Sequence, residues 1–256
     1  MLGLQTSIGA LNDLVDAPLD AGRKPGKPIP RGLVTLRQAR AAVGLTALAG
    51  LALSAASGLA TLLAAVAAIG LGFVYDLRLS RSPVSWLPLA LALPVVPIHA
   101  WLGATGQLPV ELLGLVPVAV LAGGSLAMAN GLVDAERDAA SGRRGSVVAL
   151  GSTRAWVAQT AGLGLAAALT VVIAPAGAAI VGDGGVLSGS DAFGLLGTLR
   201  VWGVVVGIGL IGLGAAALLA RRASIRERGW ELEAIGVAAV GVGWLAGTAS
   251  VMSLAK

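Results

Sequence analysis

Closely spaced carboxylates near the start of the chain are the first residues whose type and spacing could do chemistry. The sequence NDLVDAPLD places Asp13, Asp16 and Asp20 three and four residues apart. At about 100° per residue a helix would bring all three toward one face, although Pro18 is expected to end or kink that helix. Asp13 and Asp16 are therefore the better placed pair. Such carboxylates repel one another unless a cation neutralises them, and hard oxygen ligands of this kind suit Mg²⁺.

A second acidic group has the sequence NGLVDAERD and contains Asp134 and Asp138. These two residues are four apart, so on a helix they lie about 40° from one another, whereas Glu136 points roughly the other way. Both acidic groups are followed by arginine or lysine and by glycine. Two such groups are weakly specific by themselves, and the first is also compatible with a solvated acidic loop balanced by Arg23 and Lys24.

The elements that carry these acids are strongly hydrophobic. Of the 256 residues, 56% are hydrophobic and 12% are charged, and the mean hydropathy is +0.87. A soluble domain has about 25% charged residues, and here charge is confined to short stretches between apolar runs of about 20 residues, the length that spans a bilayer. We therefore predict an all-α, polytopic transmembrane helix bundle. Its seven spans are expected at 38–56, 57–75, 84–103, 109–131, 155–180, 196–220 and 232–254.

The apolar segment before the first acidic group is too short to be an eighth span. As a helix, residues 1–12 would reach about 18 Å, against a hydrocarbon core of roughly 30 Å. The first acidic group is therefore expected to lie on a truncated N-terminal helix. From the same length we expect the native reading frame to extend upstream of Met1 by roughly 40–60 residues.

Basic residues alternate between the predicted loops and indicate an orientation. Except for Arg200 and Lys256, every lysine and arginine falls in one of four loops that would lie on the same side of the membrane. The positive-inside rule makes that side cytoplasmic, so both acidic groups are expected at the cytoplasmic face. The net charge of +5 then reflects loop bias and not nucleic-acid binding. The four loops are 13–40, 76–83, 132–154 and 221–231.

The acidic groups, their order and their surroundings resemble the two motifs of the UbiA family of intramembrane prenyltransferases. The pattern N-D-x-x-D-x-x-x-D followed by RKPGKPIPRG is similar to the first motif of that family, and the segment from Asp134 to Asp138 is similar to the second. The resemblance implies a single transmembrane prenyltransferase domain over 1–256 that lacks the first helix and much of the second. It also implies transfer of a prenyl group from an isoprenyl diphosphate to an aromatic or other lipophilic acceptor, in what we expect to be a bacterial plasma membrane.

The same resemblance implies roles for individual residues. Two Mg²⁺ ions would grip the diphosphate, and they would stabilise it as the allylic C–O bond ionises. Basic side chains would contact the phosphates, arginine bidentately. The implied metal ligands are Asp13, Asp16, Asp20, Asp134 and Asp138, of which all but Asp20 are also implied to be catalytic, together with Tyr75. The implied diphosphate contacts are Asn12, Arg23, Lys24, Lys27, Arg31, Arg78 and Arg143.

The segment YDLRLSR is the least complete match. It begins at Tyr75 and resembles the family's Y-x-x-x-K element, but Leu79 stands where the family has lysine. Arg78 or Arg81 could substitute, although lysine and arginine are not equivalent at a phosphate site. An interfacial tyrosine beside a basic loop is the alternative interpretation. His99, the only histidine, is expected to have a structural role near the opposite membrane face.

Three other classes of protein are alternatives to this interpretation. A cation-coupled transporter would place its acids near the bilayer midplane on broken helices, whereas these acids cluster at one interface. A CDP-alcohol phosphotransferase would carry a D-G-x-x-A-R signature, which the sequence lacks. An inactive family member that serves as a membrane scaffold stays an alternative because the N-terminal helix is short. The acceptor and the prenyl chain length have no readable signature.

Overall fold

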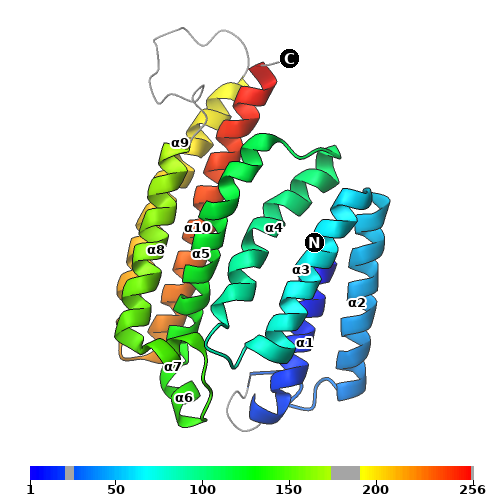
Figure 1. The fold of residues 1–256 in the computed structure, drawn as a ribbon, viewed down its shortest axis with the longest axis vertical. Coiled ribbons are helices and arrows are strands. Elements are labelled where there is room, and N and C mark those ends of the chain that lie inside the picture. Colours follow the sequence, from blue (N-terminus) through cyan, green and yellow to red (C-terminus); the bar gives the residue numbers. More distant parts are fainter. Residues whose placement is uncertain (21–25, 174–190, 255–256) are drawn as a thin grey trace. The chain divides into compact units, whose positions relative to one another are not determined.

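All regular structure that can be described in this protein is helical. In the described residues every element is a helix (Figure 1), which confirms the predicted all-α fold class. The chain divides into two compact units, an N-terminal unit, Met1–Pro109, and a C-terminal unit, Val110–Lys256. The computed structural model describes residues 1–20, 26–173 and 191–254, except for the side chains of 111, 191–197 and 247–254.

The N-terminal unit is built around α1, which packs against both α2 and α3, while α3 also packs against α4 (Figure 1). The helix α1 does not end at Pro18 but continues to Asp20. A proline in the last turn removes only one hydrogen bond of the ladder, so the helix can continue past it. The elements are α1 (Leu2–Asp20), α2 (Leu36–Ala56), α3 (Leu59–Val74), the π-helical turn η1 (Tyr75–Leu79) and α4 (Trp86–Thr105).

Small residues set the close packing of α1. A Cβ atom on Gly50 of α2 would lie 2.7 Å from Leu4, and one on Gly72 of α3 would lie 2.6 Å from Ile8. Membrane helices gain from such close approach because burial of apolar surface gives them little driving force. A hydrogen bond of 2.9 Å between Ser54 and the buried His99 links α2 to α4.

The described part of the C-terminal unit contains two pairs of long helices and two short ones. The helices α9 and α10 pack along one another, and α5 packs against α8 and α10. The two short helices, α6 and α7, connect α5 to α8 (Figure 1). The elements are α5 (Val110–Val133), α6 (Ala135–Ala140), α7 (Ser146–Leu150), α8 (Ser152–Val172), α9 (Asp191–Ala217) and α10 (Ala223–Leu254).

Among the described residues, six helices are long and apolar enough to cross a membrane, and each corresponds to a predicted span. The seventh, 232–254, lies within α10, whose side chains are described only as far as Ala246. The predicted span 155–180 extends beyond the helix, because α8 ends at Val172. Its last residues, 174–180, lie outside the described residues. The membrane-spanning fold is thus confirmed, with an approximate span count. The candidates are Leu36–Ala56, Leu59–Leu79, Trp86–Thr105, Leu112–Val133, Ser152–Val172 and Thr198–Ala217.

Glycines allow α9 and α10 to approach backbone to backbone. A Cβ atom on Gly207 would lie 2.6 Å from the carbonyl oxygen of Gly236, and one on Gly214 would lie 2.5 Å from that of Gly229. Helix backbones can lie this close only where neither residue carries a side chain. The contact therefore tolerates no larger residue at these positions.

The replacement Gly207→Leu is expected to force α9 and α10 apart. Overpacking of this kind costs about 1–3 kcal/mol or more, so the midpoint of thermal unfolding in detergent, followed by tryptophan fluorescence, should fall by several degrees. The matched control is Gly209→Leu on the same helix, because a Cβ atom there meets nothing within 4 Å. Equal midpoints for the two variants would contradict the close contact.

Candidate functional site

The first acidic group occupies the end of α1 and faces a lysine from the segment that follows. The ammonium group of Lys27 pairs with the carboxylate of Asp13 and lies 3.4 Å from Oδ2 of Asp20. Asp20 is buried, and Asp16 lies 3.7 Å from a guanidinium nitrogen of Arg81. Two carboxylates that lie about two turns apart on α1 therefore converge on one cation. The structure thus brings Asp13 and Asp20 together, whereas Asp13 and Asp16 were predicted to be the better placed pair, because α1 continues past Pro18.

The pKa of Lys27 is raised above its ordinary value of 10.5. Burial acts to lower it, but the hydrogen bond and charge of Asp13, together with the charge of Asp20, outweigh that effect. The ammonium form is therefore present throughout the physiological range. Because the pKa is higher in the folded protein, the stability that this interaction contributes is lost only as the pH rises above 10.5 through the raised pKa.

Asp76 joins the first acidic group through a side chain that sequence analysis left without a role. Nδ2 of Asn12 donates a hydrogen bond of 2.9 Å to Oδ1 of Asp76, which is 3% exposed and lies in the π-helical turn η1. The other oxygen of Asp76 accepts no hydrogen bond from any described residue. Such π-helical turns are frequent at functional sites. The signal that could have found Asp76 is an acid directly after an apolar span, in a loop whose other charged residues are arginines.

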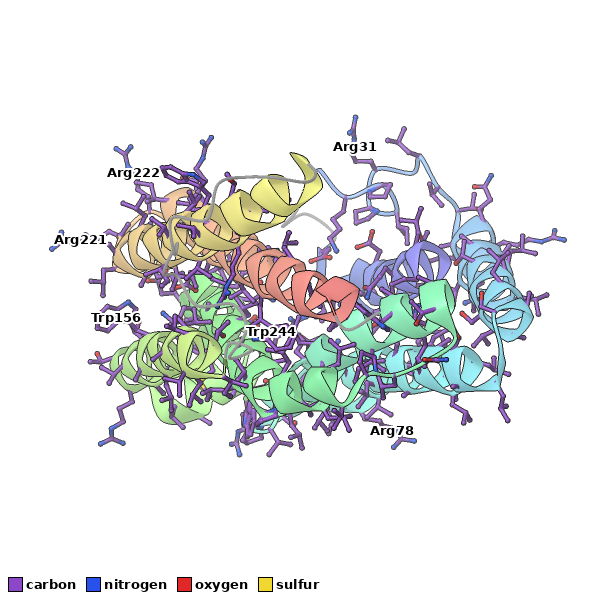
Figure 2. All side chains as sticks on the ribbon, turned by 90° about the horizontal axis from the view of Figure 1, so that it is seen from above. Arg31, Arg78, Trp156, Arg221, Arg222 and Trp244 are labelled. Atoms are coloured by element: carbon purple, nitrogen blue, oxygen red, sulfur yellow. The ribbon has the colours of Figure 1, made fainter. Side chains whose placement is uncertain are left out.

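The other site residues predicted in the N-terminal unit lie in η1 and in the segment between α1 and α2. Tyr75 is half-buried in η1, next to Asp76. Arg31 and Arg78 are exposed, and both point outward from the helices (Figure 2). Their predicted diphosphate contacts stay predictions. Arg23 and Lys24 lie outside the described residues.

The second acidic group forms a break between two helices. The helix α5 ends at Val133, Asp134 leaves the helical conformation with φ −107° and ψ 9°, and α6 then begins. The amide of Asp138 still donates a hydrogen bond of 2.9 Å to the carbonyl of Asp134, so the two residues keep the spacing of one helical turn. The sequence predicts that both aspartates follow the apolar helix, and the structure adds a helix break at Asp134 that was not predicted.

Arginines near the second acidic group neutralise its carboxylates. Arg137 donates to Asp134 at 2.9 Å, and Arg143 lies 3.6 Å from Asp138. Arg143, a predicted diphosphate contact, therefore lies beside a predicted metal ligand. A further arginine, Arg226 of α10, also contacts this segment. From the sequence, Arg226 was placed in a basic loop and no other role was predicted for it.

The carboxylates of the two acidic groups suit a metal ion that is also bound by a substrate. They suit less well a metal ion that is bound by protein groups alone. In the parts of the chain that are described, no three carboxylate or imidazole groups come together as a complete metal site. Mg²⁺ is usually bound by one or two carboxylates, with waters and substrate phosphates completing its coordination. The convergence of Asp13 and Asp20 on the Lys27 ammonium shows that this end of α1 accommodates positive charge.

Comparison with known proteins places these motifs in a family. The sequence model of the UbiA prenyltransferase family matches residues 1–231. The chain belongs to the UbiA prenyltransferase family. The family and the type of fold predicted from the two motifs are thereby confirmed. This UbiA-family protein is also 31% identical, over 147 residues, to a digeranylgeranylglyceryl phosphate synthase of Pyrococcus abyssi. That match covers 57% of the chain and 52% of the relative, about half of its length.

Solved structures share the fold of this UbiA-family protein. A UbiA homologue from Archaeoglobus fulgidus bound to GPP and Mg²⁺ has a TM-score of 0.65 at 16% identity, covering 96% of this chain and 84% of that one. The apo structure of a UbiA homologue from Aeropyrum pernix K1 has a TM-score of 0.64 at 20% identity, covering 94% and 85%. At these identities the likeness establishes the fold.

The hydrogen bond between Asn12 and Asp76 can be tested with a double-mutant cycle. Replacement of Asn12 by leucine leaves a buried carboxylate without its donor, which should lower the free energy of unfolding by about 1–3 kcal/mol. Replacing both residues by leucine should restore most of that loss, because apolar pairs of similar shape are nearly neutral. The measurement is unfolding in detergent micelles. Losses that simply add in the double variant would show that the two side chains are not coupled.

Proposed function

We propose that this UbiA-family protein catalyses the Mg²⁺-dependent transfer of a prenyl group from an isoprenyl diphosphate to a lipophilic acceptor in the membrane. The observation that carries the proposal is the convergence of Asp13 and Asp20 on the ammonium group of Lys27 at the end of α1. Carboxylates that gather around one cation are also suited to a divalent ion that bridges protein and diphosphate. The relative from A. fulgidus, bound to GPP and Mg²⁺, supports this choice of donor and ion.

The proposed ligands come from both acidic groups. Asp13, Asp16 and Asp20 would hold one Mg²⁺ ion, and Asp134 and Asp138 a second. When bound, the ions supply positive charge that stabilises the departing diphosphate. Because these aspartates pair with basic residues of the same segments, each segment offers carboxylates to the ions and cations to the phosphate oxygens.

Basic and polar side chains are proposed to orient the diphosphate. Lys27 and Arg143 already lie beside predicted metal ligands, so their charges would reach phosphate oxygens held by the same ions. Asn12 would set the position of the first acidic group through its hydrogen bond to Asp76, and Tyr75 would line the same turn. Arg31 and Arg78, with Arg23 and Lys24, complete the proposed contacts.

Apolar helix faces would receive the prenyl tail and exclude water. The exposed large hydrophobic residues of the helices are mostly aliphatic, including Leu45 and Leu53 on α2, at 67% and 72% exposed. Such faces are compatible with lipid and with an isoprenoid chain. A carbocation formed at the allylic carbon survives only where water is kept away from it. We propose that residues 1–256 act as one prenyltransferase domain in the plasma membrane, with both acidic groups at its cytoplasmic face.

The class of acceptor to test first is a glycerol phosphate lipid. The relative from P. abyssi is named for the synthesis of digeranylgeranylglyceryl phosphate, although the match covers about half of that protein. An aromatic acceptor is the second class, as the family resemblance implies. Purified protein in nanodiscs can be offered either acceptor with a labelled prenyl diphosphate, and the prenylated product identified by mass spectrometry.

Single replacements of the proposed metal ligands should abolish this transfer. Asp13→Asn or Asp134→Asn removes a charged ligand, so the rate of product formation should fall by about 100-fold or more while membrane insertion is unchanged. The matched control is Glu231→Gln, which neutralises an exposed acid on α10. Undiminished transfer by both aspartate variants, in membranes free of any other prenyltransferase, would refute the assignment.

Removal of divalent ions should also abolish prenyl transfer, and this loss should be reversible. EDTA should reduce both diphosphate release and product formation to background, and added Mg²⁺ should restore them, because the carboxylates alone cannot neutralise the leaving group. Both products are measured together so that simple hydrolysis is distinguished from transfer. Full activity in excess EDTA would exclude the proposed mechanism, and ion-coupled flux without diphosphate release would favour a transporter.

A further inference from the structure

The second acidic group lies at the break between α5 and α6, so its position depends on the contacts that stabilise this break. A helix that ends leaves backbone carbonyls without intrahelical partners. Asp134 is flanked by Val133 and Ala135, which are both buried in the core of the C-terminal unit. Packing thus fixes the residues on both sides of Asp134. The backbone conformation of Asp134 itself depends on the hydrogen bonds that stabilise the break.

Arg226 supports this break from the first turn of α10. Its NH2 group donates to the carbonyl of Val133 at 3.1 Å and to a carboxylate oxygen of Glu136 at 2.9 Å. Its NH1 group donates to the carbonyls of Ala220 and Arg221, both at 3.1 Å, in the connection between α9 and α10. A single guanidinium group therefore joins the α9–α10 connection to the junction of α5 and α6.

The burial of Arg226 separates it from the other arginines of its loop. It is 6% exposed, whereas Arg221 and Arg222 are exposed and point away from the helices (Figure 2). Because both terminal nitrogens of Arg226 already donate to protein atoms, this residue is unsuited to contact a phosphate. Its charge instead acts on the backbone of the acidic segment.

The bond to the Val133 carbonyl matters more than the pair with Glu136. The Glu136 side chain is 78% exposed, so water and salt screen its attraction to Arg226. The bond to the Val133 carbonyl is buried and is strengthened by the charge of its donor. Val133 directly precedes Asp134, so this bond fixes the backbone from which the aspartate projects.

A second residue of α10 contacts the same junction. Trp230, one turn after Arg226, packs against the cluster that contains Val133 and Ala135. Residues four apart share a helical face, so α10 presents a planar cation and a large aromatic ring side by side to the segment that holds Asp134. Neither contact could be recognised from the spacing of the acids.

We propose that Arg226 is a positioning residue for the second acidic group, which it holds in the broken-helix geometry through the Val133 carbonyl. The proposal rests on the proposed function, because it concerns the residues that would bind Mg²⁺. Lysine keeps the charge but lacks the planar fork that reaches several carbonyls at once. The replacement Arg226→Lys should therefore disturb Asp134 and Asp138 without removing charge from the loop.

The test is the Mg²⁺ dependence of prenyl transfer by the full-length protein in nanodiscs. Arg226→Lys should raise the Mg²⁺ concentration for half-maximal rate by about tenfold or more, and saturating Mg²⁺ should restore most of the maximal rate. Glu136→Gln should change it by less than about threefold, since a screened pair contributes little. The matched control, Arg222→Lys, should behave as the wild-type protein. An unchanged Mg²⁺ dependence in Arg226→Lys, with active wild-type protein, would overturn the proposal.

Hydrogen exchange provides a readout that does not depend on activity. In Arg226→Lys the amides of 134–142 should exchange about tenfold faster than in the wild-type protein, while those of α1 keep their rates. Faster exchange in α1 as well would indicate a general loss of stability and would overturn the positioning role. If the wild-type protein transfers no prenyl group but 134–142 alone exchanges faster in the variant, the support of the break is upheld and the proposed function fails.

Discussion

Carboxylates carried on apolar helices stay in place only where cations or hydrogen-bond donors face them, because an ionised group without a partner is costly away from water. Each acidic group of this UbiA-family protein meets that requirement largely with residues that follow it closely in sequence, although Asp16 lies near the distant Arg81. Lys27 faces the end of α1, and Arg143 faces Asp138. The basic stretches after the acids therefore have a structural use in addition to any contact with a phosphate. The same constraint explains why the buried Asp76 receives a hydrogen bond from Asn12.

Two kinds of contact stabilise the fold. Along the spans, small residues bring helices together, as Gly207 and Gly236 do between α9 and α10. Near the acidic groups, polar contacts fix individual backbone positions, as Arg226 does at Val133. The helix α10 takes part in both. Close packing without polar atoms is suited to lipid, whereas a charged anchor is tolerated near helix ends, where backbone carbonyls can accept its hydrogen bonds.

Hydropathy was sufficient to predict the helical fold and most of its spans, because spanning length and periodicity are local properties of the chain. The spacing of the acids predicted that carboxylates of α1 share a face. Neither hydropathy nor spacing could predict the π-helical turn at Tyr75, the break at Asp134 or the roles of Asp76 and Arg226. The partners in these contacts lie 64 residues apart for Asn12 and Asp76, and 93 for Arg226 and Val133. Tertiary packing, which a local pattern does not contain, decides such pairs. The metal and diphosphate roles of the acidic groups stay predictions.

The pairing of Lys27 with two aspartates has a consequence for the ionic conditions under which α1 can accept a ligand. A cation tethered by a short stretch of chain is present at an effective concentration in the millimolar range, whatever the solution contains. If Asp13 and Asp20 bind Mg²⁺ as proposed, the ion would have to displace the ammonium group of Lys27, which the chain keeps close by. An ion that arrives together with a diphosphate would then be favoured over a free ion, because the diphosphate would give the displaced ammonium group a new counter-charge.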